Sequence, residues 1–217
     1  VYDRAELQRL VRRFDADGWQ ILIHAMGDGA VRLALDSYES AATAQPAPPR
    51  GRRHRIEHAY LMDPADAPRF GKLGVIAAYQ PVDQFRPPGP PSTVDAARPP
   101  QEGARWNMVR AQGGTISLGS DWPVYSMNAL ARIYGIAASP RADQRMALRP
   151  LLDAYTRDSA YTSFDEADQG ALEAGKFADI VILSRDIAGA PPATIQDLAV
   201  EMTIFNGRVV YQRATAP

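Results

Sequence analysis

Short apolar segments alternate with amphipathic helices through the first half of the chain, and this alternation limits the possible folds more than any other sequence feature. Four segments have the length and composition of buried strands, at residues 19–25, 53–59, 75–79 and 115–118. The helical spacing of apolar residues predicts helices over 7–14, 30–40, 64–70 and 101–111. Strands that are joined through helices form right-handed crossovers, so we expect an α/β fold with a parallel sheet.

Three other segments shape the predicted organisation. Residues 86–100 contain six Pro in fifteen and follow the third strand, so we expect an irregular lid or wall over the carboxyl ends of the strands. From residue 169 the pattern becomes β-rich, with strands at 180–183 and 202–211, the latter a hairpin around Asn206-Gly207. We therefore expect an α/β domain over 1–168 and a small β unit over 169–217.

Composition excludes several classes of function. The 24 Lys and Arg against 25 Asp and Glu give a net charge of −1, which argues against nucleic acid as a partner. The absence of Cys rules out disulfides, thiolate metal sites and a Cys nucleophile. No apolar run is long enough to span a bilayer, so we expect a soluble, cytoplasmic protein. Because the chain starts in helical periodicity without Met or a leader, we also expect that it begins partway through a domain.

Polar residues end three of the predicted strands. His24 and His58 end two of them, and Asp121 follows the fourth. The carboxyl ends of parallel strands meet at one edge, where α/β proteins build their sites. Neutral imidazole and carboxylate groups suit Zn²⁺, Fe²⁺ or Mn²⁺. The spacing alone leaves a second interpretation open, in which both histidines are packed, hydrogen-bonded residues.

Four ordered motifs resemble amidohydrolase family 3, a branch of the metal-dependent amidohydrolase superfamily that includes N-substituted formamide deformylase-like enzymes. They are IHAMGD (23–28), RIEHA (55–59), LGSDWPV (118–124) and GALEAGKFAD (170–179). The resemblance runs through nearly the whole chain. It implies that residues 1–168 form strands five to eight of a (β/α)8 barrel and that 169–217 belong to a small β-sandwich.

The resemblance also implies roles for individual residues. His24 and His58 would bind a divalent metal, most simply zinc with iron or manganese as alternatives. Asp121 would bind the metal and transfer the proton of the nucleophilic water. The family's His-x-His pair on strand one is absent, because no His-x-His occurs in this sequence. Half of the expected metal ligands are therefore missing from the chain.

The remaining candidates have structural as well as functional interpretations. Gln80, Trp122 and Tyr125 follow the third and fourth strands, where they either bind substrate or simply pack. His54 lies in a basic run and is expected to be solvated or bonded to backbone. Glu57 alternates with His58 and should face away from the site, paired with an Arg. Asp28 and Asp63 are expected to cap helices.

Two functions from different classes remain. The first is a hydrolase that attacks an amide or another non-peptide C–N bond of a small molecule through a metal-activated water, with Asp121 passing the proton to the leaving amine. The second is a non-catalytic half barrel that associates with itself or with a missing N-terminal half. Both are compatible if the parent protein is an enzyme and this chain alone is inactive.

Overall fold

The computed structural model describes residues 2–81 and 105–214, so the proline-rich segment 86–100 lies outside the described residues. The chain forms two compact units, Val1–Gly119 and Ser120–Pro217. No helix within the described ranges is both long and apolar enough to cross a membrane.

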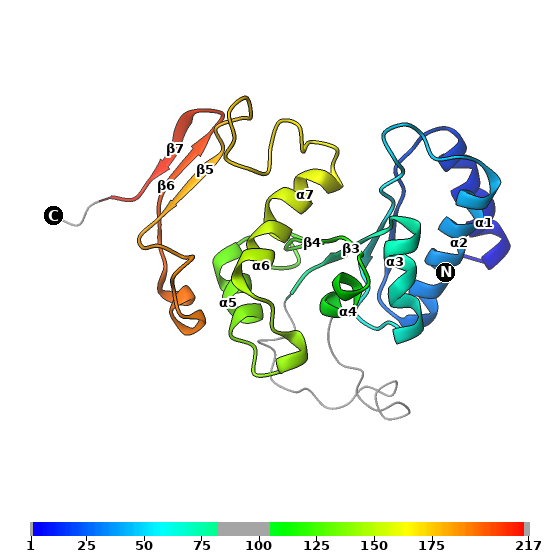
Figure 1. Cartoon of the computed structure of the whole chain (residues 1–217), viewed down its shortest axis with the longest axis horizontal. Coiled ribbons are helices and arrows are strands. Elements are labelled where there is room, and N and C mark those ends of the chain that lie inside the picture. The colour runs from blue at the N-terminus through cyan, green and yellow to red at the C-terminus, as the bar shows by residue number, and fades with distance from the viewer. Residues whose placement is uncertain (1, 82–104, 215–217) are drawn as a thin grey trace. The chain divides into compact units, whose positions relative to one another are not determined.

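A four-stranded parallel sheet forms the centre of the first unit. Its strands lie in sequence order, β1 (Leu22–Ala25), β2 (Arg55–His58), β3 (Ile76–Tyr79) and β4 (Ile116–Leu118) (Figure 1). All three strand pairs are parallel. The α/β class and the parallel sheet expected from the sequence are confirmed.

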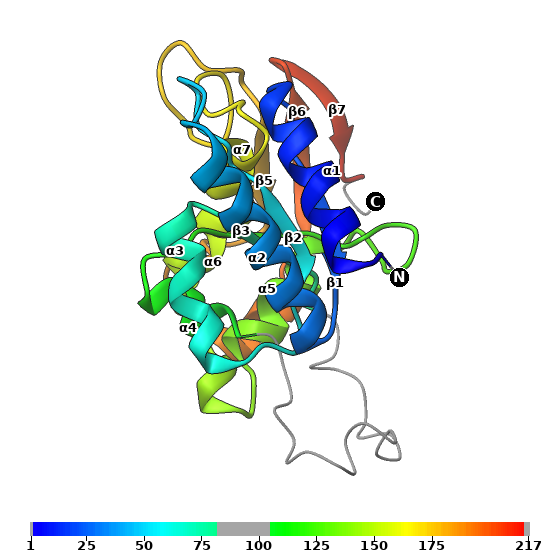
Figure 2. The same cartoon turned by 90° about the vertical axis from the view of Figure 1, so that its right-hand side faces the viewer.

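Helices cover one face of this sheet. Figures 1 and 2 show α1, α2 and α3 on the same side of the strands. The helices of the first unit are α1 (Arg4–Ala16), α2 (Asp28–Ala44), the 3-10 turn η1 (Pro64–Asp66), α3 (Ala67–Leu73) and α4 (Trp106–Ala111). The apolar stripe of α2 is fully buried and includes Val31, Leu35 and Tyr38. On the opposite face of the sheet, at its β1 edge, the Leu22 side chain is 48% exposed.

The two predicted helix caps have different outcomes. Asp63 caps η1, because its carboxylate accepts the backbone N–H of Ala65 at 3.0 Å. Asp28 does not cap α2. It is the first residue of that helix, Gly27 occupies the cap position, and the Asp28 carboxylate accepts the N–H of Gly29 instead.

A buried polar cluster joins α1 to the start of β2. The Nε2 atom of His54 lies 3.1 Å from a carboxylate oxygen of Asp15, and the backbone N–H of Ile21 donates to His54 Nδ1 at 3.2 Å. Arg52 also donates to Asp15, at 2.7 Å, and the His54 ring stacks on Tyr38 with centroids 4.8 Å apart. His54 is 1% exposed, so it is bonded to backbone as expected but is not solvated.

The second unit combines short helices with a small antiparallel sheet. It contains α5 (Ala129–Ala137), η4 (Ala142–Gln144), α6 (Leu148–Tyr155), α7 (Arg157–Thr162), β5 (Ile180–Leu183), η5 (Pro192–Asp197), β6 (Val200–Phe205) and β7 (Arg208–Gln212). The sheet order is β5-β6-β7. Asn206 and Gly207 both have positive φ, as the predicted type I′ hairpin requires.

The boundary between the two units differs from the expected division at 168/169. It falls at 119/120, directly after β4. The helices that follow β4 join the C-terminal segment because α5 packs against η5. The division into 1–168 and 169–217 stays a prediction about the folded family domain.

Candidate functional site

Two histidines meet at the carboxyl ends of neighbouring strands. His24 lies in β1 and His58 ends β2, and their ring centroids are 4.4 Å apart with the ring planes at 70°. His58 is only 8% exposed, and its Nδ1 atom is buried without a hydrogen-bond partner in the described structure. A buried ring nitrogen without a partner is costly unless something binds it. This nitrogen makes the pair a candidate ligand site.

Strand register alone would not bring these two rings together. Residues that pair across a parallel ladder share a face, and the observed pairs are His24 with Glu57 and Ala25 with His58. Regular pleating would then place the two histidines on opposite faces. His58 instead adopts φ 76°, which ends the strand geometry and allows its ring to lie against that of His24.

Two of the predicted site residues have left-handed backbone. His58 (φ 76°), the following Ala59 (φ 47°) and Asp121 (φ 54°) have positive φ although none is glycine, as do Arg53, Phe164 and Asn206 elsewhere in the described residues. Such a conformation costs about 1–3 kcal/mol per residue and persists where the surrounding structure enforces it. Two of the three predicted metal ligands carry this strain.

A lateral row of residues crosses all four strands at the level of His24. The successive pairs are His24 with Glu57, Glu57 with Ala78, and Ala78 with Ser117, and we call these four residues the central row. Glu57 is paired with Arg55, as expected, because Arg55 donates from Nε and Nη2 to Glu57 Oε1 at 2.8 and 2.6 Å. The expectation that Glu57 faces away from the site is wrong, since its register places it on the face of His24.

Gln80 lies just past the end of β3 and is 6% exposed. The hydroxyl of Tyr60 donates to the Gln80 backbone oxygen at 2.9 Å and lies 3.3 Å from its side-chain Oε1. The Tyr60 ring is 5.4 Å from that of His58. Tyr60 was not anticipated from the sequence, although an aromatic residue two positions after a strand-ending histidine is a signal that could have found it.

The other predicted site residues lie in the second unit. Asp121 is exposed, and its backbone oxygen accepts the N–H of Val124 at 2.8 Å. Trp122 is 64% exposed, and Tyr125 lies under the guanidinium of Arg132 at 5.6 Å. Within residues 2–81 and 105–214, no group of three or more His, Asp or Glu side chains is placed to hold a metal ion. The convergence of Asp121 with the histidine pair stays a prediction.

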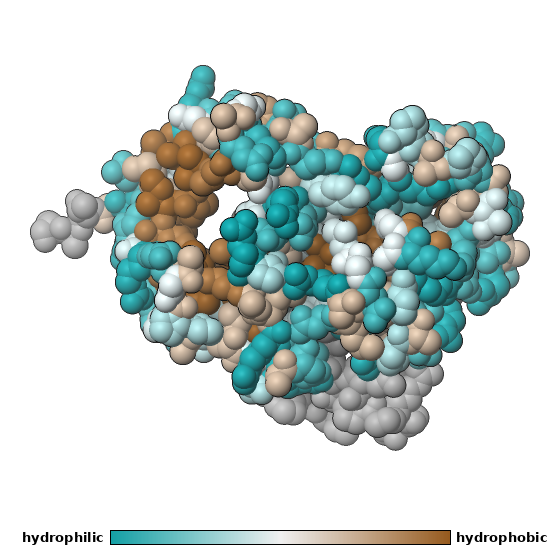
Figure 3. Space-filling view, viewed as in Figure 1, coloured by the Kyte–Doolittle hydropathy of each residue, from teal (hydrophilic) through white to brown (hydrophobic). Residues whose placement is uncertain are grey.

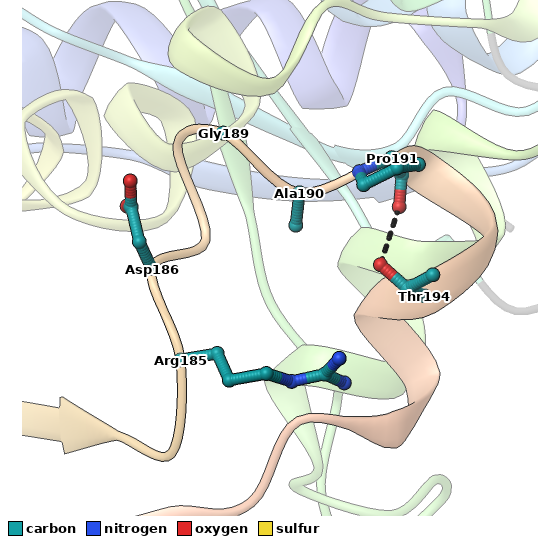
Figure 4. Close-up of a pocket in the computed structure, with 6 residues that line it drawn as sticks. All are labelled: Arg185, Asp186, Gly189, Ala190, Pro191 and Thr194. Carbon is teal, nitrogen blue, oxygen red and sulfur yellow. Dashed lines mark hydrogen bonds between the residues drawn. The ribbon is translucent and has the colours of Figure 1, made fainter.

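A hollow of about 370 Å³ in the second unit contains none of the predicted residues. It is lined by Arg185, Asp186, Gly189, Ala190, Pro191 and Thr194 (Figure 4). Its polar groups are partly used locally: Thr194 donates to the Pro191 oxygen at 2.9 Å and Asp186 accepts the N–H of Ala188. With one exposed arginine and no histidine, this hollow does not have the chemistry of the predicted site.

Comparison with known proteins gives a family match over residues 1–211, to a family described as "Amidohydrolase family". Protein LONG AFTER FAR-RED 3 of Arabidopsis thaliana is 34% identical over 193 residues, which cover 85% of this chain and 33% of that protein. N-substituted formamide deformylase of Arthrobacter pascens is 28% identical over 223 residues, covering 98% of this chain and 40% of the enzyme. The chain thus spans a third to two-fifths of the length of these relatives.

Solved structures share the fold. An uncharacterised metal-dependent hydrolase from Pyrococcus horikoshii OT3 aligns with a TM-score of 0.71 and 24% sequence identity. The alignment covers 88% of this chain and 39% of that structure. At this identity the likeness concerns architecture alone.

Proposed function

The chain belongs to the amidohydrolase family, and from that premise we propose that it forms part of a metal-dependent hydrolase for amide or other non-peptide C–N bonds of small molecules. The observation that carries the proposal is the histidine pair. Two imidazoles from neighbouring strands lie with ring centroids 4.4 Å apart, and one of them has a buried nitrogen without a partner. Imidazole nitrogens are favoured ligands for Zn²⁺ and also suit iron and manganese.

Residue roles follow from this chemistry. His24 and His58 would hold a divalent metal, most simply zinc, with Asp121 as a carboxylate ligand that follows β4. Such a metal would supply Lewis-acid chemistry and a water molecule of lowered pKa. The Asp121 carboxylate would accept the proton of the attacking water and deliver it to the leaving amine nitrogen as the C–N bond breaks.

Substrate binding is assigned to residues around the strand ends. The side-chain amide of Gln80 accepts from the Tyr60 hydroxyl at 3.3 Å and donates to the Ala78 backbone oxygen at 3.4 Å. A fixed amide can orient a substrate carbonyl or amine through hydrogen bonds. Trp122 and Tyr125, which follow Asp121 in the chain, supply apolar walls. We also propose that residues 1–168 supply strands five to eight of a (β/α)8 barrel.

We further propose that the chain acts together with another polypeptide, either a second copy or the segment that supplies the remaining barrel strands. Large apolar side chains on β5, β6 and β7 remain exposed, including Val181 at 55% and Phe205 at 63%. Figure 3 shows apolar residues gathered over this sheet. Exposed apolar patches of this kind are typical of interaction surfaces. The relatives' greater length is consistent with such a requirement.

Metal binding and hydrolysis test the proposal together. The purified chain, alone and mixed with the N-terminal half of a family member, is assayed for zinc content and for hydrolysis of a panel of N-acyl and N-formyl amines. We expect weak zinc binding and no measurable amidase activity from the chain alone, and activity when the N-terminal half is supplied. His24→Ala, His58→Ala and Asp121→Asn should each abolish that activity.

His54→Gln is the matched control, because it replaces a histidine of the same unit that lies away from the pair and bonds to Asp15. It should retain zinc binding and reconstituted activity. Zinc binding and hydrolysis that survive His24→Ala and His58→Ala would overturn the assignment of the site.

A further inference from the structure

We propose that Glu57 is the carboxylate that orients His24, and that Arg55 holds this carboxylate in place. The inference rests on the proposed metal-binding role of His24 and gives a role to Glu57, a residue of the RIEHA segment to which the resemblance assigned none. Glu57 would act as a positioning residue through a hydrogen bond from the His24 ring. It would not touch the reacting atoms itself.

The register of the sheet places the two side chains together. His24 of β1 and Glu57 of β2 are direct partners in the parallel ladder, so they extend from the same face of adjacent strands. Neighbouring strands lie about 4.8 Å apart. On the other side of Glu57 the row continues with Ala78, whose small side chain leaves the carboxylate room to turn towards His24.

The hydrogen bonds of Glu57 leave one oxygen available. Both donors of Arg55, Nε at 2.8 Å and Nη2 at 2.6 Å, bind the same atom, Oε1. Within the described part of the chain no donor reaches Oε2. An arginine that fixes one oxygen of a carboxylate restricts the rotation of the group and directs the second oxygen. The Glu57 side chain is 21% exposed, so the available oxygen lies in a partly desolvated position.

The chemistry of histidine ligands explains why this oxygen matters. A histidine that binds a metal through one ring nitrogen carries a proton on the other, and a carboxylate that accepts this N–H fixes the tautomer and orientation of the ring. Glu57, the ladder partner of His24 on the same sheet face, carries such an acceptor in Oε2. In this proposal the Arg55–Glu57 ion pair holds the carboxylate that orients His24. It does more than link two neighbouring residues.

Glu57→Gln separates these roles. The two donors of Arg55 require an oxygen at the Oε1 position, so the amide nitrogen takes the place of Oε2 and offers His24 a donor where it needs an acceptor. Glu39→Gln is the matched control. Glu39 lies on α2 of the same unit, and its Oε2 atom accepts from Arg69 at 2.8 Å. The substitution therefore also removes a carboxylate that pairs with an arginine.

Zinc titrations followed by histidine ring ¹⁵N–¹H NMR provide the readout, with Zn²⁺ as the only added component and chemical unfolding of each variant as a check on folding. In the parent chain, Zn²⁺ should produce a slowly exchanging His24 N–H signal. Glu57→Gln should lose this signal and bind zinc about 10- to 100-fold more weakly. Glu39→Gln should match the parent chain in both measurements.

The outcomes distinguish this inference from the proposed function. If His24→Ala and His58→Ala abolish zinc binding while Glu57→Gln behaves like Glu39→Gln, the metal site stands and the role of Glu57 is overturned. If zinc binding survives both histidine substitutions, the metal site fails and the orienting role of Glu57 fails with it. Loss of the His24 signal in Glu57→Gln alone supports both.

Discussion

At the scale of single residues, the five-residue segment from His54 to His58 contains two histidines in opposite situations. His54 has both ring nitrogens bonded, Nδ1 accepting from Ile21 and Nε2 facing Asp15. His58 is buried with one nitrogen unbonded. A fully bonded histidine stabilises the fold, whereas a buried nitrogen without a partner calls for an explanation. This difference in hydrogen bonding is why we propose a ligand role for His58 and a structural one for His54.

We predict that His54 makes stability depend on pH near neutrality. Burial lowers the pKa of His54 below its usual value of 6.5, and the opposing attraction of Asp15 does not restore it. The folded state therefore binds fewer protons than the unfolded state below pH 6.5. The free energy of unfolding should be highest above pH 6.5 and should fall as the pH decreases from 6.5 towards the lowered pKa.

Urea unfolding of the parent chain and of His54→Gln between pH 5 and 7.5 checks this prediction. Gln accepts from Ile21 and donates to Asp15 without titrating, so its stability should vary less over this range. Asp15 keeps its charge there, because hydrogen bonds from Arg52 and Gln45 outweigh burial and lower its pKa. His54→Ala leaves buried groups unbonded and should cost about 2–4 kcal/mol at pH 7.5. Equal pH profiles for the parent and His54→Gln would refute the prediction.

At the scale of elements, close packing of α3 against the end of α4 requires glycine at position 71. A Cβ atom built on Gly71 would lie 2.5 Å from the backbone oxygen of Gln112, the residue that ends α4. Backbone cannot move aside as a flexible side chain can. The contact therefore depends on the absence of a side chain.

Gly71→Ala should destabilise the chain by about 1–3 kcal/mol, the usual cost of overpacking. Gly29→Ala is the matched control, since Gly29 also lies in a helix but an added Cβ would meet no atom within 4 Å. Its free energy of unfolding should stay within about 1 kcal/mol of the parent value. Chemical denaturation measures both, and similar stabilities for the two variants would contradict the assigned packing.

Periodicity and turn chemistry were sufficient to predict most elements of the first unit and the C-terminal hairpin. The strand-end rule placed His24 and His58 at neighbouring strand ends, and their rings are in contact there. It failed for Glu57, because alternation along a strand does not anticipate a residue such as His58 that leaves strand geometry through positive φ. The helices α5 to α7 and the boundary at 119/120 were not predicted, since that boundary depends on long-range packing of α5 on η5.

At the scale of the whole molecule, the small sheet presents apolar side chains on a surface that a monomer would leave in water. Val181 pairs with Thr203 across the β5–β6 ladder, and Phe205 lies two residues further along β6 on the same face. Val181 is 55% and Phe205 63% exposed. Exposed apolar strands with open edges favour association with other chains.

We predict that the purified chain is larger than its monomer mass of 23.7 kDa in light scattering. Combining Val181→Lys with Phe205→Lys should reduce the measured mass towards that value, because two charges on one face disfavour its burial. Ala5→Lys adds charge on the exposed side of α1 and should leave the mass unchanged. A parent chain that is monomeric over its accessible concentration range would contradict the prediction.

The central row also bears on how this protein could acquire new specificities. Two of its four members, Ala78 and Ser117, are small and continue the row from Glu57 across β3 and β4. Substitutions at these two positions add volume or polarity along the same row as His24 while the parallel ladder that carries it is unchanged. If the proposed role of His24 holds, natural drift and a directed-evolution library would both vary these two positions while His24 is kept.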